Sequence, residues 1–264
     1  MFGIDSHAHL FHRGLPLAVD CRYAPDHDAP LEAYLAELDR FGLTHGVLVQ
    51  PSFLGTDNSY LLECLARAQR RLRGIAVLDP ATSLDELHAL DRAGVVGIRL
   101  NLVGCALPDL AHAAWQDFLA GIAKLGWQIE LQRRAADLPA LVSRLLVYEL
   151  TVVLDHFALP DLALGTADPA FAEVLKLGPS RRVWVKLSGA YRNGPQGRAF
   201  ARAAYPHLRE AFGIERLMWG SGWPHTQFEA TQTFAANRAF LDDLISDEGE
   251  RAGVLAAPRA LFRF

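Results

Sequence analysis

Short apolar segments alternate with longer segments of helical periodicity along the whole chain. The apolar segments are rich in Val, Ile and Leu, and most are apolar throughout, as expected for parallel strands buried on both faces. Most neighbouring segments start about 30 residues apart, which is the size of a βαβ unit. We predict eight strands, at Met1–Asp5, His45–Gln50, Leu72–Leu78, Val95–Leu100, Trp127–Leu131, Thr151–Leu154, Val183–Leu187 and Arg216–Trp219.

The segments between these strands carry apolar residues at helical spacing. In Leu31–Phe41 they form one stripe, and Gly42 follows at a position that ends a helix. Ser83 and Glu86 form a Ser-x-x-Glu capping box, and Asp57 is placed to cap the helix before it. Further helices are predicted at Trp115–Leu125, Leu138–Leu146, Pro169–Leu177, Arg198–Phe212, Thr226–Ile245 and Glu248–Leu261.

Eight β/α repeats favour a TIM (β/α)8 barrel over an open doubly wound sheet. The open sheet usually has a Gly-rich phosphate loop after its first strand, whereas this chain has His7-Ala8-His9 there. No linker or change of composition divides the sequence. We therefore expect a single domain over residues 1–264.

Composition and charge narrow the choice of partners. The chain is 51% hydrophobic and 21% charged, and its net charge of -4 argues against a nucleic-acid partner. Its apolar runs fall well short of the roughly 18 residues of a membrane span, and its start does not resemble a signal peptide. Three widely spaced cysteines argue against a disulfide framework or a structural zinc site. We expect a soluble cytoplasmic protein, and the sequence leaves its oligomeric state open.

Polar side chains gather where the predicted strands end, which is the end of a TIM barrel that carries the active site. His7 and His9 are two residues apart, so on a strand they would point to the same face. Other strands end near Ser52, Arg99, Gln132, Asp155-His156, Lys186 with Ser188, and Gly220 to His225. Each could be structural alone, but their coincidence at one rim predicts a site.

These residues also carry a family resemblance. The motifs are Asp5-Ser6-His7-Ala8-His9, Gln50-Pro51-Ser52, Ile98-Arg99-Leu100-Asn101, Leu154-Asp155-His156-Phe157, Val185-Lys186-Leu187-Ser188-Gly189 and Met218 to His225. Over nearly its whole length the chain resembles the amidohydrolase superfamily, and within it the 2-pyrone-4,6-dicarboxylate lactonase group. The resemblance implies a hydrolase that opens a small lactone bearing carboxylates, often without metal, in the degradation of aromatic compounds.

The resemblance also implies residue roles. The residues expected to polarise the scissile carbonyl are His7, His9 and His156. The residues expected to bind the substrate are Tyr23, Ser52, Arg99, Gln132 and Arg192. Arginine suits a carboxylate because its planar fork binds both oxygens. Tyr23 is matched only by its place in the loop after the first strand.

The chain departs from the family at two positions. Gly222 stands where the last strand normally carries the Asp that activates water, and Gln132 stands where relatives often have His or Tyr. Three explanations of Gly222 compete. The chain is a divergent member with weak or altered activity, it is an engineered or erroneous variant of an active enzyme, or Asp5 or Asp155 replaces the missing carboxylate.

The same two departures affect whether a metal ion is expected in the site. We expect no cofactor, and the alternative is a divalent ion such as zinc held by His7, His9 and His156. The leading hypothesis is thus a lactonase impaired at Gly222. The alternatives are a silent barrel that binds a small carboxylate, and a metal-dependent amidohydrolase or decarboxylase.

Overall fold

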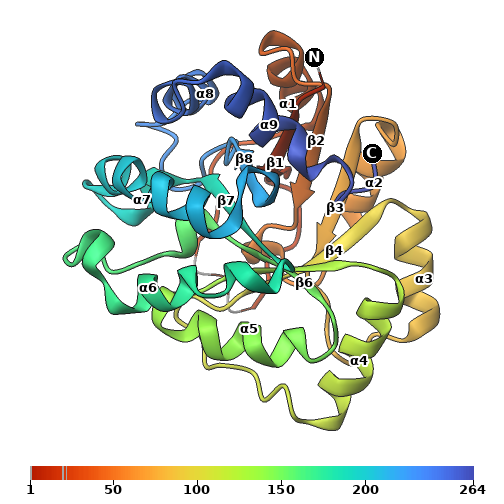
Figure 1. Ribbon diagram of the computed structural model, residues 1–264. Coiled ribbons are helices and arrows are strands. Elements are labelled where there is room, and N and C mark those ends of the chain that lie inside the picture. The colour runs from red at the N-terminus through yellow and green to blue at the C-terminus, as the bar shows by residue number, and fades with distance from the viewer. Residues whose placement is uncertain (1, 20, 22) are drawn as a thin grey trace.

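The computed structural model describes residues 2–19, 21 and 23–264, and eight parallel strands form its centre (Figure 1). Each strand pairs with the next in chain order, from β1 to β8. The strands are β1 Ile4–Ala8, β2 His45–Val49, β3 Leu72–Ala76, β4 Val95–Asn101, β5 Gln128–Gln132, β6 Thr151–Leu154, β7 Val183–Ser188 and β8 Leu217–Gly220. The predicted TIM barrel is confirmed, although Met1, where we expected the first strand to begin, lies outside the described residues.

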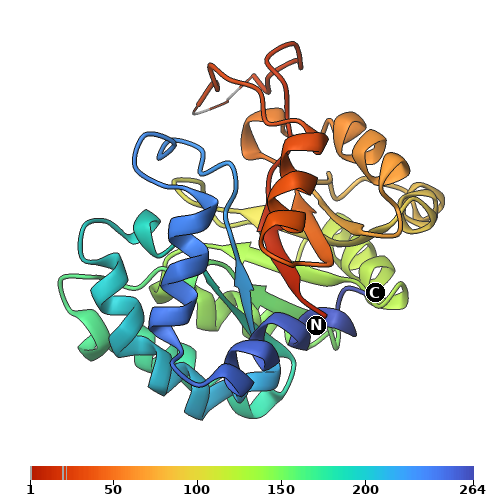
Figure 2. The ribbon, with the colours of Figure 1, turned by 90° about the horizontal axis from the view of Figure 1, so that it is seen from above.

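Helices surround the strands (Figure 1), and the long loops after β1 and β8 rise together on one side (Figure 2). The Ser83–Glu86 capping box is present at the start of α3. The helices are α1 Leu31–Arg40, α2 Ser59–Arg67, α3 Leu84–Arg92, α4 Ala113–Lys124, α5 Leu138–Leu146, α6 Pro169–Leu175, α7 Gly197–Phe212, α8 Phe234–Leu244 and α9 Glu248–Ala256. No helix in the described part of the chain combines the length and the hydrophobicity that crossing a membrane requires.

Backbone and side-chain hydrogen bonds join β1 and the residues after it to the segment that follows β8. His9 N donates to Trp223 O at 2.8 Å, and Gly222 N donates to His7 O at 2.8 Å. The Asp5 carboxylate accepts from Ser221 N at 2.8 Å and from Ser221 Oγ at 2.6 Å. These contacts close the barrel directly beside the histidine motif.

Two of the three apolar clusters among the described residues involve the strands. The larger one lies between the strands and the surrounding helices. The smaller one joins inward-facing strand residues to the end of the chain, with Ile4, Ile75, Met218 and Phe262 among its buried members. The C-terminal residues therefore pack against the strands' inner face, and the polar ends of the strands are left for the site.

Two predicted boundaries were wrong in ways that matter for the site. The first strand runs to Ala8, so His7 lies on the strand itself. The helix expected at Thr226–Ile245 begins only at Phe234, where Thr233 caps it. His225 and Gln227 have positive φ angles, which a right-handed helix excludes. The residues before Thr233 form a loop instead, and part of this loop lines the site.

Candidate active site

A cavity of about 600 Å³ opens at the carboxyl ends of the strands, where TIM barrels carry their sites. It brings together seven of the nine predicted site residues. The members that line it are His9, Tyr23, Ser52, Arg99, Gln132, His156 and Arg192. His7 and Gly222 are not among them, because both are buried behind this layer.

Three arginines give the lining of the cavity a positive charge. Arg99, Arg134 and Arg192 line it from three separate strand ends, and none of the described lining residues is acidic. Arg134 was missed by the sequence reasoning, although it follows β5 two residues after Gln132. The only signal for it was the run Gln132-Arg133-Arg134 at a strand end, which does not say which arginine turns inward.

Arg99 is held rigidly at the base of the cavity. Its Nε and Nη2 donate to Asp155 Oδ2 at 3.1 and 3.0 Å, and Nη2 also donates to Gln132 Oε1. Burial alone would raise the pKa of Asp155, but Lys186 and Arg99 outweigh it and lower that pKa to about 2. Gln132 therefore orients an arginine, a role that needs only its acceptor oxygen.

Arg192 reaches the cavity from the turn after β7. Its guanidinium donates to the carbonyl and the hydroxyl of Thr226, both at 3.3 Å. It also lies 5.3 Å from the ring centre of Tyr191 and 5.5 Å from that of Phe228. These contacts orient the side chain, and no carboxylate among the described residues pairs with it, so its charge is available to a ligand.

His7 and His9 form a hydrogen-bonded pair. Their Nε2 atoms lie 3.2 Å apart, and His9 Nδ1 lies 2.7 Å from the carbonyl oxygen of Val49. Burial is the main cause that lowers the pKa of both imidazoles well below the usual value. Both rings are therefore neutral near pH 7.

His156 follows β6 on an unusual backbone. Residues 156–159 all have φ between 45° and 63°, which makes one left-handed turn. Asn193 Nδ2 donates to His156 O at 3.3 Å, and the ring Nδ1 lies 2.9 Å from Ser188 Oγ. Burial lowers the pKa of His156 to about 3, so this ring is neutral too.

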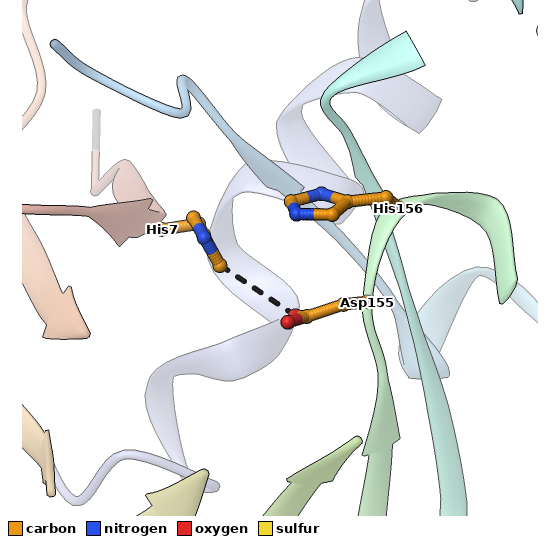
Figure 3. A group of neighbouring side chains, drawn as sticks. All are labelled: His7, Asp155 and His156. Atoms are coloured by element: carbon orange, nitrogen blue, oxygen red, sulfur yellow. Dashed lines mark ion pairs between the residues drawn. The ribbon is translucent and has the colours of Figure 1, made fainter. Parts of the chain in front are cut away.

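His7, Asp155 and His156 form a cluster of metal-ligating type, with their nearest ligand atoms within 4.8 Å of one another. Figure 3 shows the three side chains, His7 from β1 and the other two from the end of β6. Its dashed line joins His7 and Asp155, whose Nδ1 and Oδ1 atoms lie 3.6 Å apart. The predicted metal set, with His9 in place of Asp155, differs from this cluster.

The cluster does not fit a metal ion in its present arrangement. Lys186 Nζ lies 3.0 Å from His7 Nδ1 and 3.5 Å from Asp155 Oδ1. A catalytic zinc site needs about three protein donors that turn lone pairs to one point. Here two of the three residues already face an ammonium group, which repels a cation.

Gly222 has a φ of +72°, and its missing side chain leaves no open space. A Cβ atom at this position would lie 2.6 Å from Tyr191 Oη. The Tyr191 hydroxyl in turn lies 3.3 Å from His225 Nδ1. The space beside residue 222 is therefore filled by a tyrosine hydroxyl.

Neither carboxylate suggested as a replacement faces the cavity. Asp5 is occupied by Ser221, by Tyr34 Oη at 3.1 Å and by the backbone N–H of His7 at 3.2 Å. Burial raises the pKa of Asp5 to about 6 in spite of these bonds. Asp155 is committed to Arg99 and lies close to Lys186. Of the three explanations of Gly222, substitution by Asp5 or Asp155 is the one that this geometry opposes.

Tyr23 and Ser52 lie at the outer part of the cavity. Tyr23 Oη donates to Glu229 Oε1 at 2.9 Å, which ties the loop after β1 to the loop after β8. Burial and Glu229 together raise the pKa of Tyr23 to about 12. Ser52 lies on the short turn after β2 and is exposed.

The chain is similar to known proteins over most of its length. The 2-pyrone-4,6-dicarbaxylate hydrolase of Comamonas testosteroni is 32% identical over 84% of this chain and 76% of its own length. A solved structure from Pseudomonas putida, assigned as a 2-pyrone-4,6-dicarboxylic acid hydrolase, is 47% identical, with coverage of 99% and 97% and a TM-score of 0.93. A structure with the same assignment from Acinetobacter baumannii, solved with citric acid bound, is 39% identical over 100% of both chains, with a TM-score of 0.97. A family model described as Amidohydrolase matches residues 4–264, and the chain therefore belongs to the amidohydrolase family of hydrolases.

Proposed function

We propose that this enzyme hydrolyses a small cyclic ester that carries at least two carboxylate groups, with 2-pyrone-4,6-dicarboxylate as the first candidate. The observation that carries the proposal is the charge of the cavity. Three arginines line it and none of its described lining residues is acidic. Such a cavity favours a compact polyanion, because each carboxylate can take a bidentate arginine.

The relatives support the same substrate class. The Comamonas protein carries the name of a hydrolase of a pyrone dicarboxylate, and the Acinetobacter protein was solved with citric acid, a tricarboxylic acid. We accordingly expect a role in the degradation of aromatic compounds. The cytoplasmic location and the single-domain organisation over residues 1–264 stay predictions.

In the mechanism that we propose, Arg192 and Arg134 bind the substrate carboxylates. Arg192 is oriented by Thr226 and by two aromatic rings, whereas Arg134 is exposed at the wall of the cavity. Ser52 and Tyr23 complete the binding surface on the side of β1 and β2. This division leaves the base of the cavity, between Arg99 and His156, for the scissile carbonyl.

His156 polarises that carbonyl in our proposal. If the Ser188 hydroxyl donates to Nδ1, the ring hydrogen resides on Nε2 and can be donated to the carbonyl oxygen. Arg99, fixed by Asp155, adds positive charge beside the developing oxyanion. Preorganised donors of this kind typically contribute on the order of 3 kcal/mol each to the lowering of a barrier.

Water activation is the weak step. No described lining residue offers a carboxylate, and Gly222 occupies the family's position for it. The loss of a general base typically lowers a rate by about two to four orders of magnitude. We therefore expect slow turnover that depends on hydroxide concentration.

The test is a spectrophotometric assay of 2-pyrone-4,6-dicarboxylate opening, paired with calorimetric binding. We expect slow hydrolysis, with KM raised at least about tenfold in Arg134→Gln and Arg192→Gln. Arg144→Gln, which removes an exposed arginine from α5, is the matched control and should behave like the wild type. Absence of both turnover and binding would exclude the proposal.

A second candidate is favoured by Gly222 alone. The chain could bind a carboxylate without converting it, as a sensor or carrier does. Tight calorimetric binding of the same pyrone, lost in Arg192→Gln and accompanied by no turnover at any pH, is the outcome that selects this function.

A further inference from the structure

A buried lysine lies directly beneath the candidate site. Lys186, on β7, is fully buried, and its Nζ lies 2.6 Å from Glu130 Oε2 on β5. The same atom lies 3.0 Å from His7 Nδ1 and 3.5 Å from Asp155 Oδ1. An ammonium group is buried only where acceptors surround it, and here two carboxylates and an imidazole do so.

An ammonium group has three hydrogens and no lone pair, so it can only donate. His7 Nδ1 must therefore present its lone pair to Lys186, and the hydrogen of this neutral ring lies on Nε2. We infer that the Lys186 ammonium takes the place of a divalent cation among His7, Asp155 and His156, and that it fixes the tautomer of His7. Lys186 is in this sense a positioning residue, because it acts through His7.

The contact between His9 and the Val49 carbonyl supports the inference independently. The Val49 carbonyl can only accept, so His9 carries its hydrogen on Nδ1 and a lone pair on Nε2. The two Nε2 atoms that meet at 3.2 Å are then one N–H from His7 and one lone pair from His9. Lys186, His7, His9 and Val49 thus form one chain in which every hydrogen bond runs the same way.

Without the ammonium, the tautomers would be free to change. In the tautomer with a lone pair on His7 Nδ1, the ligand atoms of His7, Asp155 and His156 lie within 4.8 Å of one another and could turn to one cation. The Lys186 charge excludes that state. This accounts for a His-x-His motif in a barrel whose electrostatics disfavour a bound cation.

The test is cobalt binding by the double variant Glu130→Gln/Lys186→Met. It removes one buried charge of each sign, so no unpaired carboxylate is created at Glu130. We expect the wild type to bind Co²⁺ weakly, and the variant to bind it at least on the order of 100-fold more tightly, with visible absorption bands of nitrogen and oxygen ligation. Adding His156→Ala should abolish the gain. Lys176→Met, at an exposed lysine after α6, should bind Co²⁺ as the wild type does.

Equal Co²⁺ affinity of the wild type and the folded double variant would overturn the inference. A second measurement needs no change to the Lys186 cluster. The ¹⁵N chemical shifts of the wild-type imidazoles report which ring nitrogen carries hydrogen, with His7→Gln used to assign the signal. We expect His7 to carry it on Nε2, and a His7 hydrogen on Nδ1 contradicts the inference.

Discussion

The Tyr191 hydroxyl fills the space that a side chain at position 222 would need. This limits what restoring the missing carboxylate can achieve. Asp tolerates a positive φ better than most residues, so the backbone at +72° is a modest obstacle. The hydroxyl of Tyr191 is the larger one, since it lies 2.6 Å from the Cβ position, whereas the next atom, Cζ, lies at 3.7 Å. Removing that single oxygen turns a clash into ordinary contact.

We therefore expect Tyr191→Phe/Gly222→Asp to raise kcat/KM at least about tenfold over the wild type, as a new general base should. Gly222→Asp alone should gain less, because the tyrosine must move first. Steady-state assays of the pyrone and urea unfolding of each variant measure both effects. Tyr191→Phe alone is the control, and a single Gly222→Asp variant as active as the double one would contradict the steric argument.

The sequence predicted most of the residues that line the cavity, but not which residues are buried beneath that lining. Seven of nine predicted residues line the cavity, because polar residues at strand ends reach the same rim. The burial of His7 could not be predicted, because the first strand was expected to end at Asp5. It continues through Ser6, His7 and Ala8. The positions of Arg134 and Lys186 depend on loop path and on ion pairs between distant strands, which periodicity does not reveal.

Among the elements, β1 is joined to the segment after β8 in part by the carboxylate of Asp5. Asp5 Oδ2 accepts from Ser221 Oγ at 2.6 Å, and the same hydroxyl accepts from Trp223 N at 3.0 Å. The hydrogen bond from Gly222 N to His7 O belongs to the same junction. Loss of the hydroxyl should therefore weaken both the barrel and the geometry of the site.

We expect Ser221→Ala to lower the free energy of unfolding by about 1–3 kcal/mol, because it leaves buried partners unsatisfied. Urea denaturation measures the change. Ser143→Ala is the matched control, since the Ser143 hydroxyl only donates to Pro139 O within α5, and it should change stability little. Equal stability of the two variants would show that the junction does not depend on this hydroxyl.

Element types were predictable where burial alone determines them, as in the β/α alternation. The start of the helix in the eighth repeat was not, because apolar spacing continues back through residues that form a loop before Phe234. Positive φ angles at His225 and Gln227 interrupt the helix there. Such angles are set by tertiary contacts, among them the approach of Tyr191 to His225.

At the scale of the whole molecule, buried neutral histidines make stability depend on pH. Burial lowers the pKa of His225 from 6.5 to about 4. Between these values the unfolded chain binds a proton that the folded chain does not, so stability falls as pH falls through this window. At pH 5 the loss is about 2 kcal/mol for one such histidine.

We accordingly expect His225→Gln to lose less stability than the wild type between pH 7.5 and pH 5, by about 2 kcal/mol. Urea unfolding at the two pH values measures this difference, and the comparison of slopes is independent of any stability lost at pH 7.5. Ser143→Ala, which removes a hydroxyl that does not titrate in this range, is the control and should keep the wild-type slope. If the stability of His225→Gln falls between pH 7.5 and pH 5 as steeply as that of the wild type, the assignment of a lowered pKa to His225 is wrong.

The left-handed turn at residues 156–159 has a consequence for the order of folding. Each left-handed residue other than glycine costs about 1–2 kcal/mol, so an isolated chain rarely holds four in succession. The turn must wait for partners from elsewhere, such as the Asn193 amide and the Ala135 backbone N–H that donates to Leu159 O. Both come from other repeats of the barrel. His156 should then reach its place late, after the strands have assembled, and a misassembled barrel would lack the site altogether.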